Sequence, residues 1–299
     1  MARLSQTGAR PLLACEISAG SVIAARCSRK PPHVEMFTSR NLRPGVITPG
    51  LTGPNVQDAS ALRTAIQDTL GPLSGKSRDV IAIIPDSAIR IVLLDFESLP
   101  AKPQERGPFI RFRLKKSLPF DVDHAAVSWD VQSSNGNIQV VAAVSPNSVI
   151  EEYEAAFRDA GYSPGVVLPS SLASLGMLDT QRPTLLLKID PLSITITAAE
   201  KGALRLIRTL DNPLGYKVTA AELTEVVLPS VVFFEDTSGT RIEQILVSGA
   251  VSFGEIAPVL QQQTGAGVQE LLPKDSGQNL SGDKIPPSLM AGVVGALLG

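Results

Sequence analysis

Cysteine, histidine and aromatic residues are scarce in this sequence, and each scarcity excludes a class of protein. Two cysteines, Cys15 and Cys27, cannot build a disulfide framework, and together with only two histidines they supply too few ligands for a metal site. Aromatic residues make up 4% of the chain, so Val, Ile, Leu and Ala must fill the core. We therefore expect no metal and a reducing, cytoplasmic compartment.

A strong charge excess and a long apolar run are also missing. Lys and Arg number 27 against 29 Asp and Glu, so the basic excess that marks a nucleic-acid-binding protein is absent. The first ten residues are polar and lack the apolar stretch of a signal peptide. The apolar run at 289–298 has about half the length that spans a bilayer. It predicts a buried terminal helix, and any contact with a membrane is expected only through partners.

The first part of the chain is rich in strand patterns. Its 299 residues exceed the usual size of one hydrophobic core, which favours two domains. Residues 12–17 and 21–27 predict a hairpin joined by three residues, Ser18 to Gly20. A strand at 33–39, a helix at 58–70 capped by Asp58 or Asn55 and a buried strand at 79–85 follow.

The same order of elements recurs in the second half. Strands are predicted at 184–189, 193–199 and 204–210, then a helix at 217–234, a strand at 244–247, a helix at 253–264 and a strand at 268–272. Pro229 should kink or divide the first of these helices. Because only the order of elements repeats, and not the sequence, the two halves predict a pseudo-repeat with a cleft between them.

An insertion separates the halves. Strands at 89–96, 125–132 and 138–144 and helices at 104–116 and 147–159 predict a small α+β subdomain, with Ser145 capping the second helix. The expected boundaries are 1–86 for domain I, 87–162 for the insertion and 163–299 for domain II. The terminal helix is expected to return towards domain I.

Several short motifs, in order, resemble the PilM family of type IV pilus assembly proteins. CEISAGSV at 15–22 is similar to the D-I-G-S-S-S-V-K opening of that family. Leu99-Pro100 with KSLPFD at 116–121, LRLIRTL at 204–210 and ILVSGA at 245–250 are similar to three later segments. The resemblance implies a two-domain actin-like ATPase (ribonuclease H-like) fold with an inserted α+β subdomain. FtsA and the cytoplasmic domain of the type II secretion L-protein share that fold and stay alternatives.

The first phosphate-binding hairpin of such a fold is altered here. An actin-like ATPase holds phosphates with backbone N–H groups and holds Mg²⁺ with carboxylates. Glu16 stands where the family has Asp, Ser18 where it has Gly, and Ile23 where it has Lys. Ser18 is the harsher change, because a side chain appears where the backbone must approach a phosphate closely.

The second hairpin departs further from the family pattern. Lys188 takes the place of a metal-side carboxylate, Asp190 takes the place of a glycine, and Pro191 has no N–H to donate. In the third motif Ala250 replaces a glycine. We therefore expect neither ATP nor Mg²⁺ as a cofactor, no catalytic residue, and a pseudo-ATPase. The degenerate nucleotide cleft comprises Glu16, Ser18, Ala19, Gly20, Ser21, Lys188, Asp190, Ser248 and Gly249.

The substitutions at Glu16 and Lys188 lead to one structural hypothesis. The two positions would otherwise carry the carboxylates that flank the metal, so an ammonium at one of them can replace the metal and attract the other. The alternative is that Lys188 reaches solvent and Glu16 is hydrated. A separation of more than about 6 Å between Lys188 Nζ and the Glu16 carboxylate would exclude the pair.

The resemblance also implies a partner. Members of this family act as scaffolds at the cytoplasmic face of the inner membrane and take the N-terminal tail of a PilN-like membrane protein between domain I and the insertion. Strand addition would hold such a tail, and other pilus or secretion components are further candidate partners. The predicted contacts are the apolar residues Ile110, Phe112, Leu114, Leu118, Pro119 and Phe120, for which membership of the core is the alternative.

Two other functions remain open on this fold. A sugar or acetate kinase would need an intact Asp in the second hairpin, which Lys188 replaces. A filament-forming protein would need nucleotide as its switch, and the fold alone does not decide between these functions. Arg111, Arg113, Lys115 and Lys116 form either a solvated helix face or a site for an acidic partner or anionic lipid.

Overall fold

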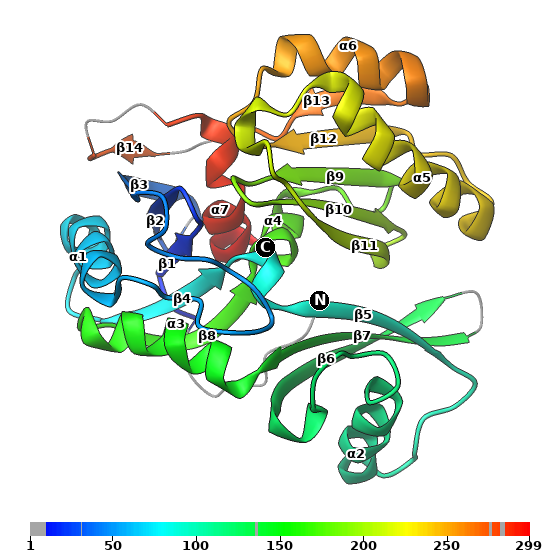
Figure 1. The fold of residues 1–299 in the computed structure, drawn as a ribbon, viewed down its shortest axis with the longest axis horizontal. Helices are drawn as coiled ribbons and strands as arrows, with labels where there is room; N and C mark the ends of the chain where they lie inside the picture. The colour runs from blue at the N-terminus through cyan, green and yellow to red at the C-terminus, as the bar shows by residue number, and fades with distance from the viewer. Residues whose placement is uncertain (1–9, 31, 135–136, 275–276, 282–284) are drawn as a thin grey trace.

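The structure is a computed structural model that describes residues 10–30, 32–134, 137–274, 277–281 and 285–299. Two larger lobes and a smaller insertion each contain a β-sheet, and helix α7 lies between the sheets of the two lobes (Figure 1). Among the described residues, no helix combines the length and apolarity needed to cross a bilayer.

Domain I is a mixed sheet of strands that were mostly predicted from the sequence. In the order β14-β3-β2-β1-β4-β8, its strands are β14 Gln278–Asn279, β3 Val34–Asn41, β2 Ser21–Cys27, β1 Leu13–Ile17, β4 Asp79–Ile84 and β8 Ser163–Pro169. Helices α1 (Ala59–Leu70) and α3 (Asn147–Asp159) cover one face, and α4 (Ser170–Ser174) and α7 (Ala291–Leu298) cover the other.

Strand β1 shows how the sequence assigns side chains to these two faces. Leu13, Cys15 and Ile17 pack against α1 and α3, whereas Ala14 packs with α7. Because successive side chains of a strand point to opposite faces, Glu16 lies on the α7 face. The alternation in β1 therefore places a carboxylate towards the junction of the two lobes.

Domain II repeats the arrangement of domain I. Its sheet has the order β11-β10-β9-β12-β13, formed by β11 Ala203–Asp211, β10 Ser193–Glu200, β9 Thr184–Ile189, β12 Gln244–Ser248 and β13 Gly267–Glu270. Helices α5 (Ala220–Ser238) and α6 (Phe253–Thr264) cover one face. Leu186 and Leu246 on the other face pack with Ala291 of α7.

The pairing of the central strands confirms the predicted pseudo-repeat. β1 is antiparallel to β2 and parallel to β4, and β9 is likewise antiparallel to β10 and parallel to β12. Glu16 and Lys188 are each the last residue but one of their strand. The two side chains therefore occupy equivalent positions in the two lobes, each just before its hairpin.

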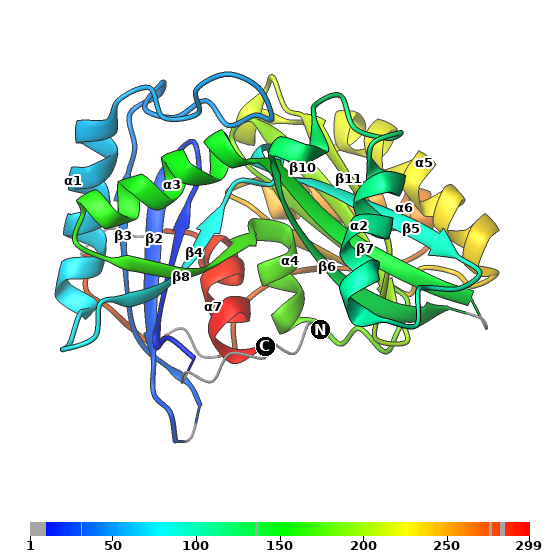
Figure 2. The same cartoon turned by 90° about the horizontal axis from the view of Figure 1, so that it is seen from below.

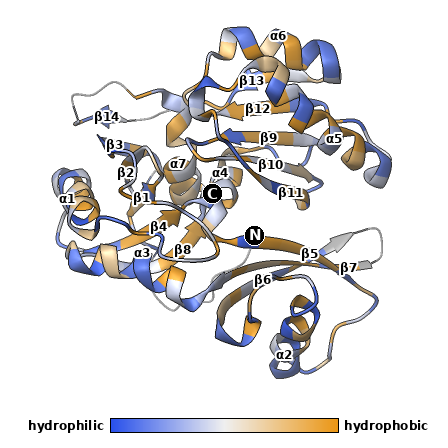
Figure 3. Ribbon diagram, in the orientation of Figure 1, coloured by the Kyte–Doolittle hydropathy of each residue, from blue (hydrophilic) through white to orange (hydrophobic). Residues whose placement is uncertain are grey.

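The insertion forms a separate layer below domain II. Its sheet, β5-β7-β6, consists of β5 Arg90–Phe96, β7 Asn137–Pro146 and β6 Ala125–Ser134, and α2 (Pro103–Leu114) packs on it (Figure 2). Short 3₁₀ helices complete the chain at η1 Gly71–Leu73, η2 Asp86–Ala88, η3 Val122–His124, η4 Leu175–Met177, η5 Gly215–Lys217 and η6 Pro287–Met290. The strands are largely hydrophobic and α3 alternates in character along its length, as an outer helix does (Figure 3).

One of the two predicted helix caps is present, and the other is not. Asp58 caps α1 as predicted, since its carboxylate accepts a hydrogen bond from Ala61 N at 2.9 Å. Ser145 does not cap α3; its hydroxyl donates to Ala88 O at 2.8 Å and ties the insertion to domain I. Pro229 lies inside α5 without dividing it.

The sheet of domain I also extends past the boundary expected at residue 163. β8 pairs in parallel with β4, and the sequence SPGVVLP hid this strand because prolines and a glycine flank its short apolar run. Domain II therefore starts near β9, after α4.

Candidate functional site

The two hairpins that would cradle phosphates share one backbone hydrogen bond, and the first is also closed by its own serine side chain. Ser18 N donates to Ser21 O and Asp190 N donates to Ser193 O, each at 2.9 Å. The Ser18 hydroxyl accepts from Ser21 N at 3.1 Å and from Gly20 N at 3.4 Å. Backbone donors that a phosphate would need in the first hairpin are thus bonded within the hairpin itself.

The hairpins also touch each other. A Cβ placed on Gly20 would lie 3.0 Å from Pro191 Cγ, so the tip of the first hairpin is in contact with the second. Pro191 contributes a ring there and has no N–H group. Asn212 fixes the second hairpin by donating to Asp190 O at 2.8 Å and to Gly215 O at 3.0 Å.

Lys188 lies at the centre of the junction between the two lobes. Its ammonium donates to both carboxylate oxygens of Asp190, each at 2.6 Å, and lies 3.4 Å from Glu16 Oε1. The side chains of Lys188 and Glu16 are each 5% exposed. The separation is well inside the limit that the sequence-based hypothesis set, and the alternative of a solvent-exposed lysine is wrong. The closer partner, Asp190, was not foreseen.

Two serines of α4 hold the carboxylates that surround Lys188. The Ser170 hydroxyl donates to Glu16 Oε1. Asp86, which follows β4, accepts from Ser171 N at 2.9 Å and from the Ser171 hydroxyl at 2.8 Å through the same oxygen. The other oxygens, Glu16 Oε2 and Asp86 Oδ2, are buried and have no hydrogen-bond partner among the residues that the structure describes.

Helix α7 packs against the part of the site that holds Glu16. A Cβ on Gly292 would overlap the carboxylate of Glu16, so a side chain at this position requires that buried carboxylate to move. The backbone of α7 and the Glu16 side chain are therefore packed face to face, and the C-terminal helix becomes a structural part of the cleft.

The electrostatics of the cluster follow from burial and from the excess of carboxylates. Burial raises the pKa of Glu16 above its ordinary value, and the nearby Lys188 ammonium opposes that rise only in part. Burial likewise raises the pKa of Asp86. Burial alone would lower the pKa of Lys188, but Asp190, Glu16 and Asp86 outweigh it and raise that pKa, so the lysine is the resident cation.

The residues present do not fit a magnesium nucleotide. In this fold the metal would lie between the carboxylates of the two hairpins, where Lys188 Nζ contacts both Glu16 and Asp190. The hairpin tips are in contact at Gly20 and Pro191, and the donors of the first hairpin are bonded internally.

The third motif of the predicted cleft supports the domain junction through η6. Ser248 donates its hydroxyl to Ser288 O at 2.8 Å, and the Ser288 hydroxyl donates to Gly249 O at 3.0 Å. Gly249 has a positive φ, and a Cβ there would lie 2.6 Å from Ile189 O. Ala19 packs against the core of domain I, and the Ser21 hydroxyl lies 3.2 Å from that of Ser18.

Four residues that contribute to this site from other parts of the chain were not predicted from the sequence: Asp86, Ser170, Ser171 and Gly292. Asp86 carried a signal, because a carboxylate directly after a buried strand is a typical site residue of an α/β sheet. Ser170, Ser171 and Gly292 carried none, since short polar or small residues far along the chain reveal no spatial neighbour.

The predicted partner residues are not all available to a partner. Ile110 and Leu114 are completely buried in the core of the insertion, because the face of α2 that carries them packs against the insertion's sheet. The prediction that these two side chains face a partner is wrong. Leu118 and Phe120 are half-buried against the same core, Pro119 is exposed, and Phe112 is 60% exposed with Lys116 over its ring.

The cleft and the duplicated sheets together define the class of this protein. Two sheets whose five matching strands follow the same order, with their hairpins in contact at a common junction and with an inserted subdomain, form the actin-like ATPase fold. The predicted fold class is thus confirmed, with α7 as the element that seals the junction.

Comparison with solved structures gives the nearer relatives of the fold. No protein-family model and no curated protein sequence matches the chain. The chain is similar to a structure of the PilM-PilN type IV pilus biogenesis complex, with a TM-score of 0.80, 18% identity and coverage of 96% of this chain and 97% of the other. The predicted likeness to PilM is confirmed at the level of fold.

Two more distant structures share this fold. The cytoplasmic domain of EpsL, an inner membrane component of the type II secretion system of Vibrio cholerae, has a TM-score of 0.53 at 10% identity, covering 93% of this chain and 92% of that one. The ethanolamine utilization protein EutJ from Carboxydothermus hydrogenoformans has a TM-score of 0.54 at 10% identity, covering 98% and 92%.

Proposed function

We propose that this chain is a scaffold of a type IV pilus or type II secretion-like machine and that it works without nucleotide. It would lie at the cytoplasmic face of the inner membrane and dock the cytoplasmic tail of a PilN-like membrane protein. The likeness to the structure of a PilM-PilN complex, over nearly the whole of both chains, supports this partner. The likeness to an inner membrane secretion component supports the location.

The observation that carries the proposal is the position of Lys188. Its ammonium bridges Asp190 of its own lobe and Glu16 of the other, in a buried site where this fold would hold a metal. A nucleotide-driven machine changes the relation of its lobes when nucleotide binds or leaves. The ammonium of Lys188 is attached to the chain and cannot dissociate as a metal ion does. The two lobes would therefore keep one relative orientation and present the same surface to a partner at all times.

The same observation argues against the two alternatives. A kinase or ATPase needs a carboxylate for Mg²⁺ and free backbone donors for phosphate. Here the carboxylates are bonded to Lys188, Ser170 and Ser171, and the first hairpin bonds its own donors. A nucleotide-switched filament would need the same site.

Chemical cross-linking of the full chain in cells, followed by identification of the linked membrane proteins, tests the docking role. A synthetic peptide of the captured protein's cytoplasmic tail should then bind the purified chain with a micromolar dissociation constant, about −8 kcal/mol. Capture of no membrane protein, or a tail peptide that does not bind, would contradict the role.

A further inference from the structure

One exposed face of α2 carries two aromatic rings and two cations. Its residues have the spacing that brings side chains onto a single face of a helix, and all are exposed: Phe109, Phe112, Arg113 and Lys116, the last in the turn after α2. Phe112 is the most exposed of them for an apolar side chain, at 60%. The opposite face of α2 packs on the insertion's sheet. These four residues form the outer face of α2.

The two cations of this face are not neutralised by the protein. Arg111 donates to a backbone carbonyl at 2.7 Å and Lys115 donates to Asp123 at 2.5 Å, so these two neighbouring cations serve the insertion itself. Arg113 and Lys116 make no ion pair or hydrogen bond with the residues that the structure describes. Each lies instead over an aromatic ring, at 5.7 Å from the ring centroid. Their N–H groups are therefore left for an outside ligand.

The segment around α2 is basic within an acidic protein. Residues 102–124 contain six Lys and Arg against three Asp and Glu, whereas the whole chain has a formal net charge of −2. Local charge decides which surface a patch attracts, because salt screens the more distant charges within about 8 Å. The outer face of α2 therefore favours an anionic ligand.

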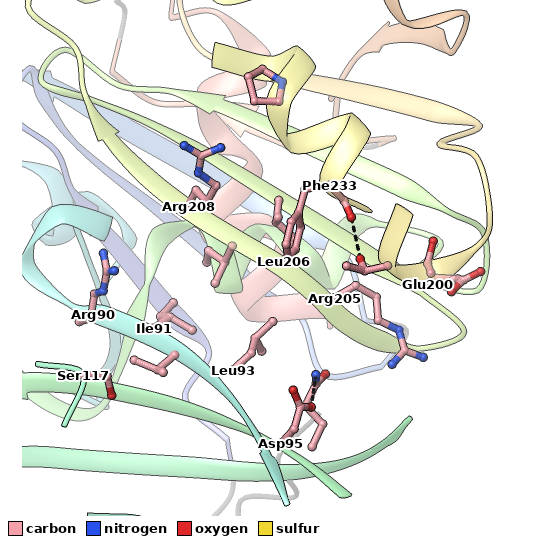
Figure 4. A pocket seen from close by; sticks show the side chains of 16 residues that line it. Arg90, Ile91, Leu93, Asp95, Ser117, Glu200, Arg205, Leu206, Arg208 and Phe233 are labelled. Carbon is pink, nitrogen blue, oxygen red and sulfur yellow. Dashed lines mark hydrogen bonds between the residues drawn. The ribbon is translucent and has the colours of Figure 1, made fainter. Parts of the chain in front are cut away.

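The shape of this face favours a lipid surface over a peptide. A peptide is held by a groove or a strand edge. A groove of about 790 Å³ lies between β5 and β11, with Leu206 and Phe233 in its lining, and no residue of α2 lines it (Figure 4). Helix α2 lies at the edge of the molecule, beyond the insertion's sheet (Figure 1).

A bilayer matches both features of the outer face. A helix bonds its own backbone groups, so this face offers a ligand only protruding side chains. In a bilayer, negative headgroups lie directly above apolar chains, and rings flanked by cations suit that boundary. An acidic protein would match the cations and leave the rings without an apolar partner.

We propose that the outer face of α2 rests on an anionic lipid surface, with its two rings in the headgroup region and its two cations on lipid phosphates. This inference rests on the proposed location at the inner membrane and adds a direct lipid contact, whereas the sequence favoured contact only through partners. The place between domain I and the insertion, which the resemblance implies for the tail, stays with the tail. Together the two contacts would fix the orientation of the scaffold.

Sedimentation of the full chain with vesicles tests the proposal without any partner protein. Vesicles of phosphatidylcholine mixed with phosphatidylglycerol should bind the chain at least about tenfold better than vesicles of phosphatidylcholine alone. Binding should be weaker than that of a single myristoyl chain, about 10⁴ M⁻¹, and should fall as salt is added. Equal sedimentation with both kinds of vesicle, or none with either, would overturn the proposal.

Two double variants with the same change in net charge locate the cationic contact. Arg113→Glu with Lys116→Glu should weaken binding to the anionic vesicles at least about tenfold. Arg63→Glu with Lys76→Glu, at two exposed positions of domain I, is the control and should weaken it less than about threefold. Equal losses would mean that only the total charge matters, and the outer face would then not be the site.

Two exposed phenylalanines provide the matched test of the aromatic contact. Phe112→Ser should weaken vesicle binding at least about fivefold, since a ring no longer enters the headgroup region. Phe233→Ser in α5, where the ring is 54% exposed, should change it less than about twofold. Phe112→Ser should also leave binding of the tail peptide unchanged. Loss of tail binding instead of vesicle binding would overturn the lipid contact, while the docking function stands.

A fluorescent label locates the contact independently of these substitutions. Cys15 and Cys27 are both buried, so Glu105→Cys, one turn before Phe109 on the same side of α2, provides one accessible thiol for an environment-sensitive dye. Its emission should shift to the blue with anionic vesicles, and the same dye at Val232→Cys in α5 should not shift. A shift at both positions would mean adsorption without orientation. No shift at α2, with an acidic soluble protein cross-linked there in cells, would assign the face to a protein, and either result would overturn the proposal.

Discussion

Lys188 Nζ lies 3.4 Å from Glu16 Oε1, and the two residues occupy equivalent positions at the ends of β9 and β1. In an actin-like ATPase these positions carry like charges and need a metal between them. Here the side chain at position 188 is positive instead of negative, so the two lobes are held together by a direct ion pair between Lys188 and Glu16.

Removal of the resident cation should destabilise the fold. Lys188→Met leaves Asp190 and its neighbouring carboxylates buried without a counter-charge, and breaking a buried pair in this way costs about 3–5 kcal/mol. Urea denaturation followed by circular dichroism measures the free energy of unfolding. An unfolding free energy within about 1 kcal/mol of the wild-type value would show that the cluster is not a structural centre.

A double-mutant cycle isolates the contact across the lobes. Glu16→Gln should lower the free energy of unfolding less in the Lys188→Met variant than in the wild type, or should even raise it. The coupling energy between the two substitutions should be at least about 1 kcal/mol. The surface pair Lys102–Glu105, at 3.3 Å and exposed, is the matched control and should show weaker coupling. Equal coupling in both cycles would place Glu16 and Lys188 among ordinary surface pairs.

A side chain at Gly292 should destabilise the chain. Gly292→Ala drives a methyl group into the Glu16 carboxylate and should destabilise the chain by about 1–3 kcal/mol, as overpacking does. Gly254→Ala, in α6 with open space around it, is the control and should be neutral or slightly stabilising. Equal melting temperatures for the two variants would contradict the packing of α7 on Glu16.

The stability should fall with rising pH in a way that depends on Glu16. Its pKa is raised by burial in the folded chain from an ordinary value of 4.5, so the folded state holds this proton more tightly than the unfolded state. The free energy of unfolding therefore decreases as pH rises from 4.5 towards the folded-state pKa. Glu16→Gln should remove that part of the slope above pH 4.5; parallel curves would contradict it.

The sequence allowed the architecture to be predicted because its signals are local. Two runs of strand-forming residues predicted β1 and β2, and the three-residue hairpin between them placed Glu16 just before a turn. The repeat of that order around Lys188 then indicated two lobes. β8 was missed because its apolar run, 166–168, is bounded by prolines and a glycine and shows no alternation.

The remainder of the site could not be predicted because it depends on contacts between distant segments. Apolar spacing along α2 is the same for a core face and a docking face, which is why Ile110 and Leu114 were assigned to a partner. Asp190 was interpreted as the loss of a glycine, although its carboxylate is the closest partner of Lys188. Only the tertiary structure shows that the two substitutions in this hairpin compensate each other.

The central claim is that an internal cation has replaced the nucleotide and its metal, and calorimetric titration of the full chain with Mg-ATP tests it most directly. Because Lys188 occupies the metal's place and the hairpin tips meet at Gly20 and Pro191, the titration should show no saturable heat up to about 1 mM ATP, which corresponds to binding weaker than about −4 kcal/mol. Saturable binding with a micromolar dissociation constant would contradict the account, because it would require the cleft to open and Lys188 to leave its carboxylates.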